Sequence, residues 1–303
     1  MKLCRREFIR AAGVAAALGT GLELGGEAKA ADTGEPAKMA RLFPGCCAYS
    51  FRKYLAAKQM TMEQFIRKGV ELRTVGLDMT VYWLASTQPD YLAGLRHLAF
   101  QCGIPFSGVA CGSTMVQETQ AKRDKTLAEI KKWIDVTDLL GASHLRVFGG
   151  GLPAGVTRAQ ALDWVVETMK PACEYAGRKG ITLGIEDHDG ITLQAESCLE
   201  IMRRVDSPFA GINLDITHFV PTATLDGYAQ IQMCLPYATH AHIRDHFDNG
   251  EPIDLDHVWQ MFAKAGYHGY MSLEYGGKEE PMTAIPRQMA RIEELCRKYS
   301  SVG

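Results

Sequence analysis

Residues 181–186 read Ile-Thr-Leu-Gly-Ile-Glu, a short apolar run that ends in a carboxylate. Successive residues of a β-strand point to opposite faces, so Leu183 and Ile185 would face covering helices. Gly184 and Glu186 would face the other side. A buried carboxylate is costly unless it is paired or binds a ligand. The stretch therefore predicts a covered strand with a functional group at its carboxyl end.

Eight segments of this kind alternate with helical patterns, and no linker divides them into two domains. The candidate strands are 42–50, 74–80, 104–111, 143–148, 181–186, 210–216, 239–245 and 270–275. Apolar residues recur at helical spacing between and after them, as at Leu127, Ile130 and Ile134 and at Ile285, Met289, Ile292 and Cys296. Eight β-α units predict an α/β fold, a closed (β/α)8 TIM barrel over residues 41–300.

A doubly wound sheet is the alternative fold. Its phosphate-binding fingerprint, a G-x-G-x-x-G motif after the first strand, is absent from the sequence. Gly149-Gly150-Gly151 has neither that spacing nor the basic residue of a phosphate loop. We therefore interpret this run as a turn at the mouth of the barrel.

Start and stop signals of helices support the same segmentation. Thr61 with Gln64 has the spacing of a capping box, and Thr157 is a second N-cap candidate. Pro286 is expected in the first turn of the last helix. Glycines that would end helices precede the next strand at Gly103, Gly141, Gly180 and Gly266.

The first thirty residues predict an export signal. Two adjacent arginines, a weakly apolar stretch and the small residues of Ala28-Lys29-Ala30 follow one another. The order resembles a twin-arginine signal; an N-terminal helix of the fold is the alternative. We predict a signal over 1–30, a linker over 31–40, and a periplasmic or otherwise exported protein.

The composition excludes several classes of partner. Of the 303 residues 22% are charged, and the formal net charge is -2. A nucleic-acid or membrane-surface protein would be expected to carry a basic patch. No apolar run long enough to span a membrane follows the N-terminus, so no membrane partner is expected after signal cleavage.

The chain has nine cysteines, one of them in the predicted signal, and no C-x-x-C pair. A twin-arginine substrate folds in the reducing cytoplasm before export. We therefore expect buried free thiols rather than disulfides, and no cysteine metal site.

The alternation rule also places ionisable groups inside the barrel on other strands. The inward residues are His144 and Arg146, Asn213 and Asp215, His240, His242 and Arg244, and Ser272 and Glu274. Active sites of barrels lie at the carboxyl ends of the strands. Glu186, Asp215, Glu274 and a histidine of the seventh strand would meet there, which predicts one divalent-metal site. Separate ion pairs with Arg146 or Arg244 are the alternative, but these cations are too few for all the carboxylates.

Ligands that are mostly oxygen favour Mn2+, Mg2+ or Co2+ over a structural zinc site. We expect one divalent ion, Mn2+ first, with Mg2+, Co2+ or Zn2+ as alternatives.

Four segments together resemble the xylose isomerase-like barrels, in particular the sugar isomerase/epimerase branch that includes D-tagatose 3-epimerase. They are Gly184-Ile185-Glu186-Asp187-His188, Asn213-Leu214-Asp215-Ile216-Thr217-His218, His240-Ala241-His242-Ile243-Arg244-Asp245 and Ser272-Leu273-Glu274-Tyr275. The resemblance covers roughly residues 42–298.

The resemblance implies specific roles for residues in these segments. Its metal ligands map to Glu186, Asp215, His242 and Glu274, which selects His242 over the deeper His240. Glu186 and Glu274 would also be the acid/base pair, and His218 would contact substrate.

The residue types suggest two further contacts. His188 and Arg146 are candidates for hydroxyl contacts and charge stabilisation. For His188 a role in supporting a neighbouring side chain is the alternative.

The resemblance implies a metal-dependent isomerase or epimerase that acts on a keto-sugar, and the residue types fit the enediolate chemistry of such a reaction. A lyase or dehydratase acting on a 3-keto-sugar or glycoside could use the same metal site. A carbohydrate-binding barrel without activity is a second alternative. An endonuclease would need more histidine ligands and a basic surface. Barrels of the family often form homo-oligomers, which the resemblance implies here.

Two positions depart from the epimerase pattern. Asp248 replaces an arginine that binds substrate, and Thr192 replaces a glutamate. The sugar contacts are therefore expected to differ. We predict that His246 and Asp248 lie in solvent on a loop. No clear phosphate cradle occurs beyond the 276–278 segment, which favours an unphosphorylated sugar.

Overall fold

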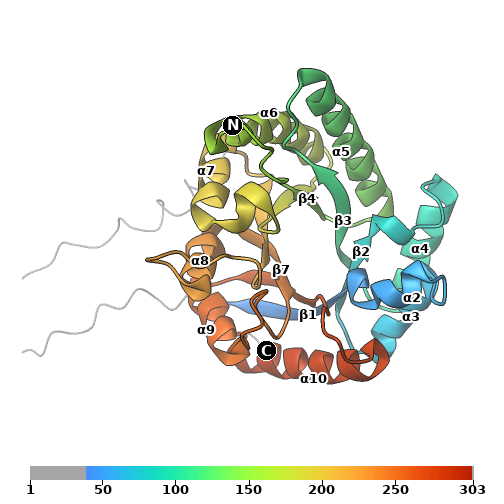
Figure 1. Cartoon of the computed structure of the whole chain (residues 1–303). Coiled ribbons are helices and arrows are strands. Elements are labelled where there is room, and N and C mark those ends of the chain that lie inside the picture. Colours follow the sequence, from blue (N-terminus) through green and yellow to red (C-terminus); the bar gives the residue numbers. More distant parts are fainter. Residues whose placement is uncertain (1–38, 302–303) are drawn as a thin grey trace, which may run out of the picture. The chain divides into compact units, whose positions relative to one another are not determined.

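The eight apolar segments form parallel strands that close in chain order around one axis (Figure 1). The computed structural model describes residues 39–301. The strands are β1 (Arg41–Cys47), β2 (Gly76–Thr80), β3 (Phe106–Thr114), β4 (His144–Phe148), β5 (Thr182–Glu186), β6 (Ala210–Asp215), β7 (Ala238–Ile243) and β8 (His268–Leu273). β8 pairs with β1, so the predicted (β/α)8 barrel is confirmed.

Helices surround the barrel on its outer side (Figure 1). The α-helices are α2 (Arg52–Ala56), α3 (Met62–Glu71), α4 (Pro89–Gln101), α5 (Gln120–Leu140), α6 (Arg158–Gly177), α7 (Ala195–Val205), α8 (Gly227–Cys234), α9 (Leu255–Ala265) and α10 (Pro281–Tyr299). Short 3-10 helices are η1 (Ala48–Phe51), η2 (Val81–Trp83), η3 (Gly190–Leu193) and η4 (Leu235–Tyr237). The apolar face of each strand is buried against this ring, which forms the main core.

The capping signals are confirmed at the helix starts. Thr61 and Thr157 each form a capping box with the glutamine three residues later, because side chain and backbone bond reciprocally. Gly141 and Gly266 end α5 and α9 with φ of 77° and 68°, a conformation that favours glycine. Gly103 and Gly180 also have positive φ.

The first-turn position expected for Pro286 is wrong. Helix α10 begins at Pro281, and Pro286 lies inside it. Proline suits the start of a helix because the first N–H groups have no acceptor within the helix. Pro281 occupies that position, while Pro286 leaves the carbonyl of Met282 without its usual i+4 donor.

The ends of the strands differ from the predicted ranges by a few residues. The first strand was expected to run to residue 50, but it ends at Cys47 and the chain turns into η1. The seventh strand begins one residue and ends two residues earlier than predicted, and the eighth begins and ends two residues earlier. This shift leaves Arg244 and Glu274 just past the strand ends, at the mouth of the barrel.

The interior of the barrel contains polar layers, as the alternation predicted. In the register of the sheet Glu186 lies beside Asn213, and Asp215 beside His242. Gly184 makes room for the imidazole of His144, since a Cβ there would lie 2.4 Å from its Nε2. Small residues therefore allow a layer of histidines to fill the barrel below the carboxylates.

The predicted signal and the predicted linker lie outside the described residues, except for Met39 and Ala40 at the end of the linker. All eight cysteines of the described part are free thiols, and all but Cys102 are buried. The expectation of buried free thiols is thus confirmed for the seven buried cysteines, and Cys102 is a free thiol that is only partly buried. Among residues 39–301 no helix has the length and apolar character needed to cross a membrane.

Candidate active site and metal centre

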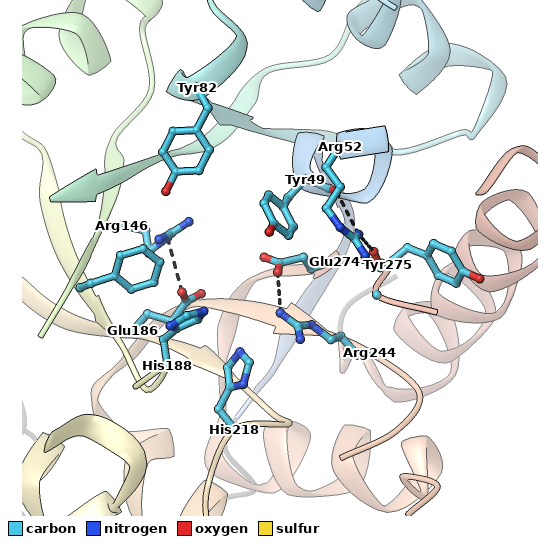
Figure 2. A pocket seen from close by; sticks show the side chains of 12 residues that line it. Tyr49, Arg52, Tyr82, Arg146, Glu186, His188, His218, Arg244, Glu274 and Tyr275 are labelled. Carbon is cyan, nitrogen blue, oxygen red and sulfur yellow. Dashed lines mark hydrogen bonds and ion pairs between the residues drawn. The ribbon is translucent and has the colours of Figure 1, made fainter. Parts of the chain in front are cut away.

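A cavity of 420 Å³ opens at the carboxyl ends of the strands (Figure 2). It is lined by Tyr49, Arg52, Tyr82, Arg146, Phe148, Glu186, His188, His218, Arg244, Glu274, Tyr275 and Gly276. Its size is within the range of small-molecule sites, and its position is that of barrel active sites. All five predicted catalytic and substrate-binding residues line it.

The four predicted metal ligands meet at the base of this cavity. One ligand atom each from Glu186, Asp215, His242 and Glu274 lies within 4.8 Å of the others, and all four side chains are buried. His242 Nδ1 is 2.8 Å from Glu186 Oε1 and 2.9 Å from Glu274 Oε2. The sequence placed these residues together correctly.

The donor set fits a divalent ion. Three carboxylates and one imidazole nitrogen are suitable ligands for Mn2+ and similar ions. Asp215 Oδ2 is buried and accepts no hydrogen bond of good geometry among the described residues, although Arg244 Nη2 and His218 Nε2 lie 3.2 Å and 3.3 Å from it. Coordination of a cation would satisfy the lone pairs of this buried oxygen.

Two arginines also compensate the carboxylates. Arg146 Nε lies 3.6 Å from Glu186, and Arg244 Nη2 lies 2.5 Å from Glu274 (Figure 2). Arg244 Nη2 also lies 3.2 Å from Asp215. The ion pairs considered as an alternative thus exist beside the cluster rather than instead of it.

The ion pairs control the charge of the site. Burial opposes ionisation of Glu186, but the Arg146 guanidinium and His242 hold its pKa below the ordinary value. Burial likewise opposes ionisation of Glu274, yet His242 and Arg244 hold its pKa well below that value. Both carboxylates are therefore ionised near neutral pH and are able to accept a proton.

His240 lies one layer deeper than His242, as predicted. Its ring stacks on His144 at 5.1 Å between centroids, and its Nε2 lies 3.3 Å from the hydroxyl of Ser272. Desolvation by burial lowers the pKa of His240 to about 4. It is therefore a neutral part of the interior rather than a member of the four-residue cluster.

Asp78 is a functional residue that the sequence analysis missed. It is buried in β2, and its Oδ2 lies 2.7 Å from Nε2 of His242. Metal-binding histidines usually donate their second ring N–H to such a carboxylate, which orients the ring. The alternation rule could have found it, because Asp78 stands between the apolar Leu77 and Met79.

The three predicted substrate contacts differ in their surroundings. Arg146 donates to the Cys111 carbonyl and lies over the Phe148 ring. His188 lies 4.8 Å from the His218 ring, and its Nδ1 has no partner among the described residues. His188 lines the cavity while this nitrogen is buried, so substrate contact and a supporting role both stay open for it.

His218 is held by two carboxylates. Its Nδ1 is 2.6 Å from Asp248 Oδ2, and its Nε2 is 3.3 Å from Asp215 Oδ2. Burial opposes a charge on the ring, but Asp215 and Asp248 raise the pKa of His218 to about 11. Asp248 is exposed on its loop, as predicted, but its carboxylate also binds His218 on the cavity wall, a contact that the sequence analysis did not anticipate. His246 is exposed as predicted.

Aromatic side chains of the cavity were also missed. Tyr49 follows β1, Tyr82 follows β2 and Tyr275 follows β8. Figure 2 shows Tyr49 and Tyr82 on the wall opposite His218. The signal available in the sequence was their position directly after strands, where loops of the barrel mouth begin.

Comparison with known proteins identifies the family. The model of the family described as "Xylose isomerase-like TIM barrel" matches residues 68–295. The chain belongs to this family. No curated protein matches the sequence of this xylose isomerase-like barrel.

Solved structures share its fold at low sequence identity. The 3-keto-D-glucoside 4-epimerase YcjR from E. coli is 14% identical, with a TM-score of 0.69 over 84% of this chain and 99% of that one. The probable 3-DHS dehydratase AsbF from Bacillus anthracis is 16% identical, with a TM-score of 0.66 over 82% and 98%. The IOLI protein, described with a binding zinc atom, is 14% identical, with a TM-score of 0.67 over 86% and 100%. Structural neighbours of this barrel thus include sugar epimerases and a dehydratase.

Proposed function

We propose that this xylose isomerase-like barrel is a metal-dependent isomerase or epimerase of an unphosphorylated keto-sugar, working through an enediolate. The observation that carries the proposal is the placement of Glu186 and Glu274. Both line one cavity, from β5 and from just past β8, and both contact the same nitrogen of His242. Two carboxyl groups that face one space can transfer protons from and to carbon, because one can accept a proton in its ionised form and the other can deliver one after being protonated.

Glu186, Asp215, His242 and Glu274 would hold the ion, with Mn2+ the first candidate. When bound there, a divalent ion polarises the substrate carbonyl and acidifies the neighbouring C–H. One of the two glutamates, in its ionised form, would then remove that proton and later release it to solvent. The other, after taking a proton from solvent, would deliver it to the same carbon on the opposite face, or to the neighbouring carbon while a hydroxyl proton moves between the two enediolate oxygens. The first outcome is epimerisation and the second is isomerisation.

The other cavity residues position the sugar and stabilise charge. The protonated His218 and the guanidinium of Arg146 are donors for the oxygens of the enediolate. Arg244 is already paired with both Glu274 and Asp215, so it is poorly available to bind a phosphate. This supports a substrate without phosphate.

The test is a panel of keto-sugars and 3-keto-glucosides in D2O with added Mn2+, in which NMR follows exchange at carbon. We expect exchange of one C–H without loss of water or of a linked group. Glu186→Gln and Glu274→Gln should each slow it by at least about 100-fold. If wild type exchanges no sugar while both variants still bind metal and sugar, the barrel is a carbohydrate-binding protein instead.

A lyase or dehydratase is a second candidate, favoured by the histidines. His188 and His218 lie together at the cavity wall, where a proton donor could assist departure of a hydroxyl or an alkoxide. Product analysis separates the two reactions. Stoichiometric loss of water or of a linked group would favour the lyase.

We also propose that the protein is exported through its N-terminal segment, on the evidence of the paired Arg5 and Arg6. The test is fractionation of cells that express the full chain. Replacement of both arginines by lysine should retain the protein in the cytoplasm. Export that is unaffected by the replacement would count against the proposal.

A further inference from the structure

A second cavity of 610 Å³ adjoins the one that contains the glutamates. Three residues, Arg244, Tyr275 and Gly276, line both cavities. The second cavity lies between the loop that follows β7 and the loop that follows β8, and Arg287 and Gln288 of α10 complete its lining. A ligand held at Glu274 could therefore extend into it past Arg244.

The wall formed by the loop after β7 is folded rather than open. An antiparallel bridge joins His246 to Pro252, and the N–H of Phe247 donates to the Glu251 carbonyl at 2.8 Å. The Asp248 N–H donates to Thr217 at 3.3 Å, which ties the loop to the end of β6. This wall is thus formed before any ligand binds, which reduces the ordering cost of binding.

The wall formed by the loop after β8 is held in the same way. The Tyr275 hydroxyl donates to the Glu279 carbonyl at 2.9 Å. The Arg287 guanidinium donates two hydrogen bonds to the Glu279 carboxylate. On its inner side the Tyr275 carbonyl accepts from Arg52. The tyrosine is therefore fixed where the two cavities meet.

The charged groups of the second cavity are largely paired with one another. Arg287 pairs with Glu279, and Asp245 accepts from Gln288 at 2.7 Å. Asp248 is bonded to His218 on the side of the first cavity. An anion would meet three carboxylates here, and the charges that line the cavity nearly balance.

A lining of polar and charged side chains together with the aromatic residues Phe247 and Tyr275 suits a neutral ligand with many hydroxyl groups. A sugar ring has this character, because it offers hydroxyls to polar groups and C–H faces to aromatic rings. A phosphate does not, since it needs several converging donors and no nearby carboxylates.

We propose that the second cavity is a binding subsite for a neutral sugar ring linked to the ring that reacts. The substrate is then a glycoside rather than a free monosaccharide, with its keto-sugar ring at Glu186 and Glu274 and the linked ring beyond Arg244. This inference rests on the proposed function for the identity of the reacting ring. The subsite itself rests on the second cavity alone.

The experiment compares 3-keto-glucose with 3-keto-maltose, in which a second glucose ring is attached. Calorimetry measures binding of each to the full chain loaded with Mn2+, and NMR in D2O measures exchange. We expect 3-keto-maltose to bind at least about tenfold more tightly, a difference of about 1.4 kcal/mol. Equal affinities for the two sugars would overturn the subsite.

The decisive variant is Lys278→Trp, which fills the second cavity from an exposed position on its edge. It should abolish the preference for 3-keto-maltose and leave binding of 3-keto-glucose within about twofold. Lys264→Trp, on the exposed face of α9, is the matched control and should keep the preference. A variant that weakens both sugars equally would also overturn the proposal.

The two hypotheses fail in different ways. If wild type exchanges neither sugar, the proposed function fails, and the calorimetric preference still decides the subsite. If both sugars exchange at equal rates and bind equally, the function stands and the subsite is wrong.

Discussion

Asp78 and His242 meet inside the barrel, with Oδ2 of Asp78 2.7 Å from Nε2 of His242. The opposite nitrogen of the ring, Nδ1, faces Glu186 and Glu274. Burial opposes ionisation of Asp78, but its hydrogen bond with His242 lowers its pKa below the ordinary value. An ionised carboxylate thus fixes the orientation of the one imidazole among the four candidate ligands.

The Asp78→Asn variant tests this orientation. The amide keeps the shape of the side chain but presents no charged acceptor to Nε2 of His242. We expect the affinity for Mn2+ to fall by about 10- to 100-fold. Calorimetric titration of the metal-free protein measures it, and the exposed Asp90→Asn on α4 is the control. An unchanged affinity would show that Asp78 does not orient the ligand.

The affinity for the ion should itself depend on pH. Burial opposes a charge on His242, but Glu274 and Asp78 raise its pKa well above the ordinary 6.5 in the metal-free protein. Coordination requires an unprotonated Nδ1, so binding releases a proton. Affinity for Mn2+ should therefore rise with pH throughout the range in which His242 is protonated. Titrations in buffers of different ionisation heat count the released proton, and a count of zero would refute this account.

Arg146 is expected to contribute strongly to stability. It is buried and lies 3.6 Å from Glu186, so its removal leaves a buried carboxylate with less compensation. We predict that Arg146→Met lowers the free energy of unfolding of the metal-free protein by about 3 to 5 kcal/mol. Urea denaturation measures the change. Arg203→Met removes an exposed pair with Glu200 and should leave the unfolding curve unchanged.

Bound metal should reverse part of this loss, because it supplies positive charge beside Glu186. The difference between wild type and Arg146→Met should therefore be smaller with saturating Mn2+ than with a chelator present. A difference that is the same in both conditions would mean that the arginine acts mainly through packing on Phe148.

The sequence predicted the barrel and the four-residue cluster because both follow from alternation along strands. The charged residues Glu186, Asp215 and Glu274 lie at the ends of apolar strands. Alternation directs their side chains to the inner face of the barrel, at the carboxyl ends of the strands. The choice of His242 over His240 needed the family resemblance, since the two histidines are two positions apart on one strand and face the same side of it. Depth in the barrel depends on register between strands, which a single strand does not reveal.

The contacts that were missed join segments far apart in the sequence. Asp78 and His242 are separated by 164 positions, and His218 and Asp248 by 30. No local pattern relates such pairs. Asp248 lies on a polar loop, where a solvated carboxylate is the common outcome, and only the fold of that loop brings it back to His218.

The buried His240 gives a prediction for stability at low pH. Desolvation lowers its pKa to about 4, because the charges of Asp78 and Glu186 only partly compensate for burial. His144, His242, Ser107 and Ser272 lie around its ring. Between about 6.5 and about 4 the unfolded chain binds a proton at this residue and the folded protein does not. The stability that depends on a neutral His240 is therefore complete above pH 6.5 and falls as the pH drops toward 4.

His240→Gln removes this titration while keeping a polar side chain near Ser272. The stability of wild type relative to the variant should decline by about 3 kcal/mol as the pH falls across that interval. Urea denaturation at a series of pH values gives the two curves, measured without metal. The exposed His97→Gln on α4 should run parallel to wild type. If the His240→Gln curve is also parallel to wild type, His240 is protonated in the folded barrel, and the polar layer beneath the ligands carries a charge.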